Sequence, residues 1–471
     1  MKKNNYKVII IGSGPGACVT GDILAEKGID VLMIEKGSNS QINEMKSFGT
    51  DEINKKYKNA GMTVAYGETL INYAEGSCVG GGSEVNSGLY HRIPISKLEE
   101  WENKNNFNFD RASLNDSYEA IENQINVSYM PKFQDQRASL KLKEGCDKLN
   151  WDCSEIPRWY KYDSKGNGIK QSMTETLIPK YLNNGGELVT KTEVLSFSEF
   201  NNKVNVKVKH QDKIKILTSD FLFVSAGAIN SPHIMLKSGL KKNIGKTLKL
   251  HPTFKFISQF DEEVNSNING VHVHQVKEFS PKISMGCSIS TKGMLAVGLN
   301  DSNNLKHISS WKKMSTYYSM ICPEGVGSVT NLPFFKSPFV RFSLTKNDYE
   351  NLYSGIEKLA QRLFNAGAIK LFPSVNSNLI IESIDDIKKI RNLSKNKLNL
   401  MTIHLFSTIP MGGVKSVHPL SPEGFLYENN SIYVSDGSML CDSPSVNPQG
   451  PIMAIARMNA INFLNRIQNE I

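Results

Sequence analysis

Residues 6–37 read YKVIIIGSGPGACVTGDILAEKGIDVLMIEKG and decide the fold. Residues 8–11 form a continuous apolar run, which is typical of a central parallel strand that is covered on both faces. Gly12, Gly14 and Ala17 then occupy the G-x-G-x-x-G/A positions. Glycines at these positions allow a tight turn between strand and helix and let the backbone approach a pyrophosphate. The pattern predicts a nucleotide-binding turn.

The second half of this stretch adds an acid. Residues 30–34 read as another strand and end at Glu35, about twenty residues after the glycines, where a carboxylate can accept hydrogen bonds from ribose hydroxyls. A glycine-rich turn in some other α/β domain is the alternative. Strand, glycines, helix, strand and acid nevertheless occur in register, so we expect a Rossmann-like domain that binds an ADP-containing cofactor.

The composition is that of an ordinary globular protein. The 471 residues are 39% hydrophobic and 21% charged, which allows two or three domains and a large core. The net charge is +9, and the densest basic run lies within residues 388–397. A solvated helix face explains this run better than a polyanion or membrane-surface site. No motif indicates nucleic acid as a partner.

Cysteine usage and hydropathy bear on the compartment. The seven cysteines are widely spread and contain no C-x-x-C, which argues against a disulfide framework, an iron–sulfur centre or a metal site and favours a reducing compartment. The apolar run after Lys2 and Lys3 is too short for a signal peptide, and no stretch reaches transmembrane length. We therefore expect a cytoplasmic protein without a transmembrane segment.

The central and C-terminal parts of the chain return to the nucleotide-binding domain. Alternating apolar and polar residues over 185–227 predict a small antiparallel meander that ends in a core strand. A strand at residues 432–435 and a long helix at about residues 449–468 close the chain. This order of elements along the chain predicts an α/β domain that is assembled from separate segments.

The remaining residues predict a second domain. An amphipathic helix is expected over residues 348–364, and Thr345 and Asp348 have capping-box spacing. The expected domains are discontinuous, namely a nucleotide-binding domain of residues 1–94, 171–252 and 401–471 and a substrate-binding domain of residues 95–170 and 253–400.

Further blocks carry glycines and polar groups. They read GSCVGGGSEVNSGLYHR at 76–92, SAGAINSP at 225–232, HLFSTIPMGG at 404–413 and SIYVSDGSMLCDSPSVNPQGPIMAIA at 431–456. Together with GSGPGA at 12–17, they resemble the blocks of the glucose–methanol–choline (GMC) oxidoreductase family, in family order over nearly the whole chain. The resemblance implies an α/β fold, with an FAD-binding Rossmann-like domain (a parallel sheet plus the meander) and an α+β substrate domain built on an antiparallel sheet.

The family reaction is the oxidation of a primary or secondary alcohol to the carbonyl, by proton abstraction and hydride transfer to flavin N5. His404 matches the active-site histidine of the family, and Asn447 matches its partner. A neutral histidine suits proton abstraction, and an asparagine can hold the substrate oxygen without titrating. The resemblance therefore implies His404 and Asn447 as the catalytic pair.

The resemblance also implies where FAD would bind. Some family members link FAD covalently through a histidine just before the position of Asn86, but here that residue is Val85, so a non-covalent cofactor is expected. The helix after Pro448 would stabilise negative charge at flavin N1/O2 with its positive end. The cofactor-binding residues carried over from the family blocks are Gly12, Gly14, Pro15, Gly16, Ala17, Glu35, Lys36, Gly80, Gly81, Gly82, Ser83, Asn86, Ser87, Gly88, Val194, Ala226, Gly227, Asp436, Gly437, Pro448 and Gln449.

Each polar candidate also has a structural interpretation. His404 follows an apolar run and could be a buried hydrogen-bond donor, and Asn447 could be a turn residue before Pro448. His251, in another block typical of the family, is expected to hold a loop near the cofactor. His91 and Arg92 are expected to be structural or to face a phosphate.

The substrate class follows less directly. Short bacterial family members that oxidise sugar or aminocyclitol hydroxyls look most similar, so a small-molecule alcohol such as a sugar or aminosugar is expected. The electron acceptor is left open between oxygen, a quinone and a protein carrier, with a dehydrogenase favoured over an oxidase. Alternatives are a hydroxynitrile-lyase-like flavoprotein on the same fold, an aromatic hydroxylase and a binding protein with a vestigial flavin. Residues expected to include part of the pocket lining are Trp311, Tyr317, Tyr318, Asn331, Phe334 and Phe335.

Overall fold

The N-terminal stretch folds as strand, turn, helix and strand. β1 (Asn5–Ile11), α1 (Pro15–Glu26) and β2 (Val31–Ile34) follow one another, and β1 pairs with β2 in parallel. The side chains of Val8 to Ile11 are at most 3% exposed, as a strand covered on both faces requires. The structure is a computed structural model, and it describes residues 3–39, 45, 48–132, 136–266, 273–301 and 303–469.

β1 lies inside an eight-stranded sheet. Its parallel part runs in the order β24 (Asn429–Val434), β12 (Lys213–Val224), β1, β2 and β9 (Glu187–Val189). β12 is long enough for its two halves to pair with different strands. Its C-terminal half pairs in parallel with β1, while its N-terminal half pairs antiparallel with β11 (Lys203–His210).

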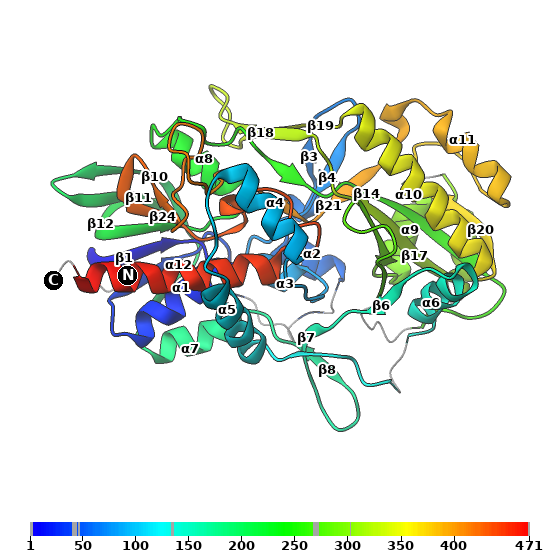
Figure 1. Ribbon diagram of the computed structural model, residues 1–471, viewed down its shortest axis with the longest axis horizontal. Helices are drawn as coiled ribbons and strands as arrows, with labels where there is room; N and C mark the ends of the chain where they lie inside the picture. The colour runs from blue at the N-terminus through cyan, green and yellow to red at the C-terminus, as the bar shows by residue number, and fades with distance from the viewer. Residues whose placement is uncertain are drawn as a thin grey trace.

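β10 (Thr192–Phe200), β11 and the first half of β12 form the antiparallel meander that the alternating residues predict. Helices α1, α7 (Leu177–Asn183), α12 (Gln449–Asn469) and α5 (Arg111–Gln124) pack against one another beside this sheet. In Figure 1 the C-terminal helix α12 runs alongside α1, so the two ends of the chain meet in one layer.

The second sheet has nine strands and is mainly antiparallel; only β21 and β4 pair in parallel. Its order is β3 (Thr63–Ala65), β4 (Ile71–Tyr73), β21 (Leu400–Thr402), β14 (Thr253–Phe260), β17 (Met314–Ile321), β16 (Ile283–Cys287), β15 (His274–Val276) and β6 (Cys153–Glu155), with β20 (Ala368–Pro373) also paired to β14. The predicted α/β fold class, with a second part built on an antiparallel sheet, is confirmed. The domain boundaries stay a prediction.

Helices cover both faces of the second sheet. α10 (Lys346–Asn365) and α6 (Arg137–Leu149) pack on one face, and α9 (Lys292–Asp301) packs beside Ile257, which points to the other face. The capping box of α10 is confirmed, because Thr345 Oγ1 accepts from Asp348 N (3.1 Å) and Asp348 Oδ2 accepts from Thr345 N (2.8 Å).

Shorter elements connect the two sheets. The helices are α2 (Thr50–Lys56), α3 (Gly82–Val85), α4 (Ile95–Asn105), α8 (Asn230–Lys237) and α11 (Lys388–Arg391), and the strands are β5 (Val127–Ser128), β7 (Arg158–Tyr162), β8 (Gly168–Lys170), β13 (Lys249–Leu250), β18 (Val326–Thr330), β19 (Phe339–Ser343), β22 (Leu405–Phe406) and β23 (Phe425–Leu426). All seven cysteines are free thiols. Within the described ranges, no helix combines the length and the apolar character needed to cross a membrane.

Candidate active site

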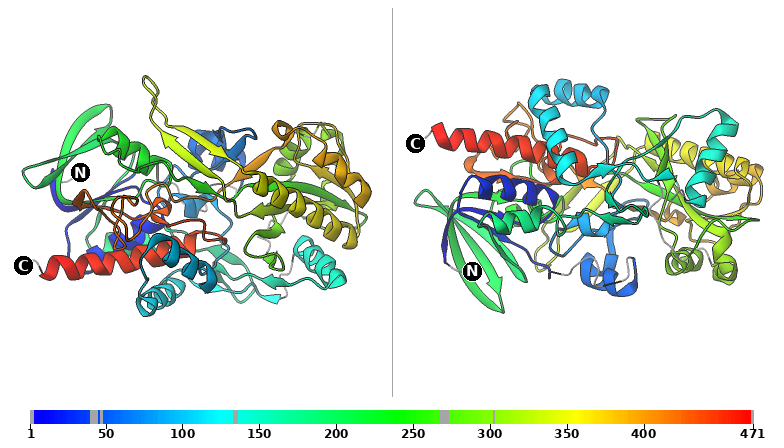
Figure 2. Two further views of the ribbon diagram at one scale, coloured as in Figure 1. Left: turned by 45° about the horizontal axis from the view of Figure 1, so that its top comes forward. Right: turned by 90° about the horizontal axis from the view of Figure 1, so that it is seen from below.

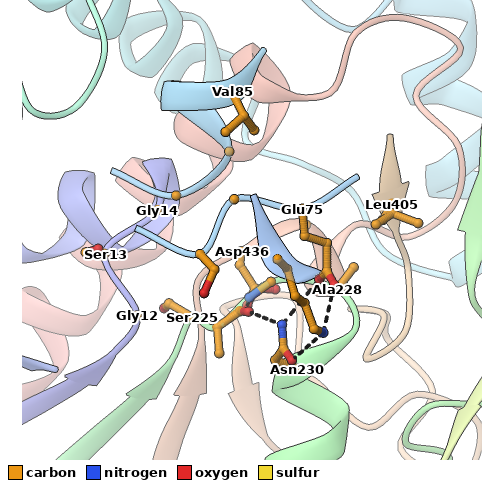
Figure 3. Close-up of a pocket in the computed structure, with 18 of the residues that line it drawn as sticks. Gly12, Ser13, Gly14, Glu75, Val85, Ser225, Ala228, Asn230, Leu405 and Asp436 are labelled. Carbon is orange, nitrogen blue, oxygen red and sulfur yellow. Dashed lines mark hydrogen bonds and ion pairs between the residues drawn. The ribbon is translucent and has the colours of Figure 1, made fainter. Parts of the chain in front are cut away.

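A cavity of about 510 Å³ opens at the C-terminal ends of β1, β12 and β24. This is where ligands bind in open α/β sheets. The nucleotide turn forms one wall, and Figure 3 shows Gly12, Ser13 and Gly14 beside Ser225 and Asp436. Gly12 has φ +101°, and a Cβ added there would lie 2.3 Å from the carbonyl oxygen of Ser225. The turn therefore requires glycine and leaves its backbone bare toward the cavity.

The second glycine-rich segment lies against this turn. Gly81 has φ +54°, and a Cβ added there would lie 2.9 Å from Cα of Gly14. Asn86, at the end of α3, donates from Nδ2 to Gln449 Oε1 (2.7 Å) at the start of α12. Three segments that are distant in sequence thus close one side of the cavity, which suits a flat ring between bare backbone walls.

Glu35 lies at the cavity wall and is only 8% exposed. Its carboxylate accepts hydrogen bonds from Ser13 N (3.1 Å), Ser13 Oγ (2.6 Å) and Gly37 N (2.7 Å). Burial raises its pKa above the ordinary value, and these hydrogen bonds oppose the rise. Lys36, next in the chain, forms an exposed ion pair with Glu193 (2.8 Å).

Asp436 joins the ends of two strands. It accepts from Gly227 N (2.8 Å), from Ser231 Oγ (2.5 Å) at the start of α8 and from Ser438 N (2.8 Å). Burial raises the pKa of this carboxyl group. The acid therefore fixes the loops that follow β12 and β24 at the cavity.

Most of the residues predicted to bind the cofactor line this one cavity. Ala17, Gly80 and Ser83 do not, because they are buried behind its wall, where Ser83 Oγ donates to Gly80 O (2.8 Å). The predicted residues that line the cavity are Gly12, Gly14, Pro15, Gly16, Glu35, Lys36, Gly81, Gly82, Asn86, Ser87, Gly88, Val194, Ala226, Gly227, Asp436, Gly437, Pro448 and Gln449.

The two predicted catalytic residues also meet at the cavity. His404 follows β21, and Asn447 precedes α12. Nε2 of His404 lies 3.3 Å from Nδ2 of Asn447, and both residues line the cavity wall. Burial lowers the pKa of His404 from 6.5 to about 4. The imidazole is thus held in its neutral form, which can accept a proton.

His251 contacts the far side of the His404 ring. β13 pairs antiparallel with β22, and Leu250 lies opposite Leu405, so the next residue of one strand falls beside the preceding residue of the other. The Nδ1 atoms of His251 and His404 are 3.0 Å apart, and Nε2 of His251 lies 2.6 Å from Ser443 Oγ. Burial lowers the pKa of His251 well below its usual value. The residue does hold a loop, but its partner is the predicted catalytic histidine.

A second polar cluster surrounds His91, which does not line the cavity but lies within electrostatic reach of His404. His91 Nε2 lies 3.1 Å from both Gln275 Oε1 and Lys277 Nζ, and Gln275 Nε2 donates to Tyr318 Oη (3.0 Å). Burial, followed by the charge of Lys277, lowers the pKa of His91, and burial lowers that of Lys277 to about 8. His91 is thus a member of a side-chain hydrogen-bond cluster and its role stays a prediction, whereas Arg92 pairs with Glu122 (2.6 Å).

The sequence did not predict every residue of the wall. Lys58 Nζ donates to Glu75 Oε2 (2.9 Å) and to Asn230 Oδ1 (3.0 Å), and Figure 3 shows the latter two side chains turned toward one another. Only Asn230 lies in a block typical of the family, so sequence gave no signal for Lys58 or Glu75. In contrast, none of the six residues expected to include part of the pocket lining lies at the cavity wall. Tyr317 is fully buried, Phe334 and Phe335 are exposed, and Trp311, Tyr318 and Asn331 are also absent from the lining.

Comparison with known proteins identifies the family to which the chain belongs. Residues 53–253 and 329–456 match the family models for GMC oxidoreductases, and residues 5–53 match the model of an FAD binding domain. The GMC-type oxidoreductase y4nJ of Sinorhizobium fredii (strain NBRC 101917 / NGR234) is 34% identical over 95% of this chain and 92% of its own length.

A curated relative and a solved structure of lower sequence identity are also similar to the chain. The long-chain-alcohol oxidase FAO1 of Arabidopsis thaliana is 22% identical over 97% of this chain and 66% of its own. The crystal structure of pyridoxine 4-oxidase from Mesorbium loti superposes with a TM-score of 0.72 at 14% identity, over 98% of this chain and 99% of that one. The chain therefore belongs to the GMC oxidoreductase family. It is an FAD-dependent oxidoreductase that acts on CH–OH groups.

Proposed function

We propose that His404 removes the hydroxyl proton of an alcohol substrate while Asn447 holds the same oxygen. The observation that carries this proposal is the 3.3 Å approach of His404 Nε2 to Asn447 Nδ2 at the cavity wall. A substrate oxygen placed between these atoms can donate its proton to the imidazole and accept a hydrogen bond from the amide. With its proton on Nδ1, neutral His404 keeps a lone pair on Nε2, which Asn447 Nδ2 reaches here and which a substrate hydroxyl would take over.

His251 decides which nitrogen of His404 is that base site. Neutral imidazole carries one proton, and the nearby Nδ1 of His251 can accept it from Nδ1 of His404. Nε2 of His404 then keeps a free lone pair on the side of Asn447. His251 in turn donates from Nε2 to Ser443 Oγ. In this proposal His251 is a positioning residue.

The cavity wall fits FAD. The glycine turn and the N-terminus of α1 would hold the pyrophosphate, Glu35 the ribose, and the segment containing Gly81 and Asn86 the ring system. The N-terminus of α12 would stabilise negative charge on the reduced ring. Bound FAD supplies the two-electron acceptor for the hydride that leaves carbon.

We further propose that FAD is held without a covalent bond. The side chain just before Asn86 is that of Val85, which lines the cavity and has no nucleophilic atom. Denaturation of the holoenzyme followed by filtration should therefore release all of the flavin into the filtrate. Flavin that stays with the polypeptide would contradict this proposal.

For the substrate we propose a hydroxyl-rich neutral molecule such as a sugar, rather than an aminosugar. The cluster of His91, Gln275, Lys277 and Tyr318 offers hydrogen-bond donors, and its member His91 lies within electrostatic reach of His404. In the described part of the chain no carboxylate forms an ion pair with Lys277, and Asp152 acts on it only at longer range, so an ammonium group placed there would be repelled.

The test is anaerobic reduction of the holoenzyme by a panel of neutral sugars, aminosugars, polyols and simple alcohols. Bleaching of the oxidised flavin spectrum by neutral sugars supports the proposal, and faster bleaching by aminosugars contradicts its finer part. A spectrum that stays oxidised with every alcohol, combined with release of cyanide from hydroxynitriles, would support the lyase alternative instead.

A further inference from the structure

The turn between β18 and β19 carries large apolar side chains into solvent. Residues 331–338 read NLPFFKSP, and Phe334, Phe335 and Leu332 are 106%, 68% and 38% exposed. Figure 2 shows this hairpin projecting beyond the rest of the molecule. Three exposed apolar side chains at one tip are unfavourable in water unless another surface covers them.

The projecting tip is anchored at its base. Oδ1 of Asn331 lies 2.5 Å from Nδ1 of His233, and Nδ2 of Asn331 donates to the carbonyl oxygen of His233 (3.1 Å). His233 belongs to α8, so the hairpin is tied to the first sheet. The apolar tip is therefore presented in a fixed orientation.

Exposed lysines lie in the turn and around the base of the hairpin. The loop after α8 lies beside the hairpin, since Val329 N donates to Gly245 O (2.7 Å), and Asn243 Nδ2 joins this loop to Ser416 O (2.9 Å). These contacts bring exposed lysines from three parts of the chain to one face. We call the apolar tip and these lysines the hairpin face; the lysines are Lys237, Lys241, Lys242, Lys246, Lys336 and Lys415.

This face lacks compensating acids. The three segments that carry the tip and these lysines, residues 237–246, 331–338 and 413–417, contain no aspartate or glutamate. Among the described residues none of the six lysines forms an ion pair, although Lys237 lies close enough to Glu193 to lower the pKa of that carboxyl group. The face is therefore both cationic and apolar.

The basic run near α11 shows the contrast. There Lys389 pairs with Asp386 (2.6 Å), Arg391 with Glu350 (2.8 Å) and Lys395 with Glu68 (3.0 Å). That run is a solvated, ion-paired surface, as the sequence predicted. Unneutralised lysines around exposed phenylalanines distinguish the hairpin face from it.

We propose that the hairpin face binds the surface of an anionic phospholipid membrane. The phenylalanines and leucine of the tip enter the boundary between headgroups and acyl chains, and the lysines lie near lipid phosphates. Reversible anchoring needs both an apolar and an electrostatic contribution, and this face provides both. Lys336, Ser337 and Pro338 also line the cavity, so docking brings one rim of the cavity next to the membrane.

The proposal is tested by sedimenting the holoenzyme with vesicles of equal parts phosphatidylglycerol and phosphatidylcholine, and with vesicles of phosphatidylcholine alone. We expect binding to the anionic vesicles that weakens between about 0.1 M and about 1 M salt. The double variant F334S/F335S should bind at least about tenfold more weakly. The variant K241E/K242E should bind at least about 25-fold more weakly, about fivefold for each lysine.

Matched controls keep the test specific. Phe200 is 66% exposed on another hairpin, and Lys213 and Lys215 are exposed lysines on β12. F200S and K213E/K215E should therefore bind like the wild type. All variants should keep their flavin spectrum and their rate of alcohol-driven reduction, which shows that they are folded.

Three results would overturn the proposal. One is no binding of the folded holoenzyme to anionic vesicles at low salt. The second is equal binding to neutral vesicles, because the lysines would then have no role. The third is a dimer in analytical ultracentrifugation without lipid that F334S/F335S converts to monomers, since the tip would then face a second copy of the chain.

Discussion

Replacing His251 by leucine tests how the environment of His404 sets its chemistry. The side chain is fully buried and joins His404 Nδ1 (3.0 Å) to Ser443 Oγ (2.6 Å). H251L removes both contacts and leaves no acceptor at this position for a proton on His404 Nδ1. H251Q is the conservative partner, since its amide oxygen can accept that proton.

The size of the effect follows from the cost of an orphaned donor. A buried N–H group without an acceptor costs about 1–3 kcal/mol. The imidazole avoids this cost by carrying its proton on Nε2, and in that tautomer Nε2 cannot accept the proton of a substrate hydroxyl held by Asn447. The productive tautomer of His404 is then depleted by about 5-fold to about 150-fold. We expect the same loss in the rate of flavin reduction at saturating alcohol, and a smaller loss in H251Q.

The assay is anaerobic stopped-flow reduction of the holoenzyme, with flavin content measured in parallel. H418L is the matched control, because His418 is also a buried, hydrogen-bonded histidine but does not line the cavity. It should lower stability without changing the reduction rate. A rate for H251L within about twofold of the wild type, with full flavin content, would refute the positioning role.

Three further predictions concern charge. Because burial lowers the pKa of His404 from 6.5 to about 4, the unfolded chain binds the proton first as the pH falls. Stability should therefore drop by about 2 kcal/mol between about pH 7 and about pH 5 in urea titrations. Over the same range the reduction rate should stay level and fall only near about pH 4; a fall centred near about pH 6.5 would contradict the buried neutral base. E35Q should weaken FAD binding about tenfold or more in titrations of the apoenzyme, because a charged acceptor is lost; an unchanged affinity would exclude Glu35 from the cofactor site. K277M should raise KM for neutral sugars and leave the limiting reduction rate nearly unchanged, and an unaltered KM would remove this lysine from substrate binding.

Local sequence patterns predicted the elements that depend on local physics. The apolar run before Gly12, the alternation of the meander and the spacing of Thr345 and Asp348 each determine structure within a few residues. The meeting of His404 and Asn447 is different, because they lie 43 positions apart. It was expected only through the resemblance of their blocks to a known family.

Contacts that depend on pairing between distant segments could not be predicted from the sequence. His251 and His404 are 153 positions apart in sequence and meet because two short strands, β13 and β22, pair with one another. Two-residue strands have no recognisable periodicity. The prediction that Phe334 and Phe335 help to line the pocket was wrong for another reason, because an apolar residue type does not distinguish a pocket wall from an exposed turn.

The most direct test of the central claim is the rate of anaerobic flavin reduction in H404A, with its flavin content and stability confirmed. If His404 removes the hydroxyl proton, the rate at saturating alcohol falls by about two to four orders of magnitude. Reduction at the wild-type rate in a folded, FAD-loaded H404A enzyme would show that another group takes the proton.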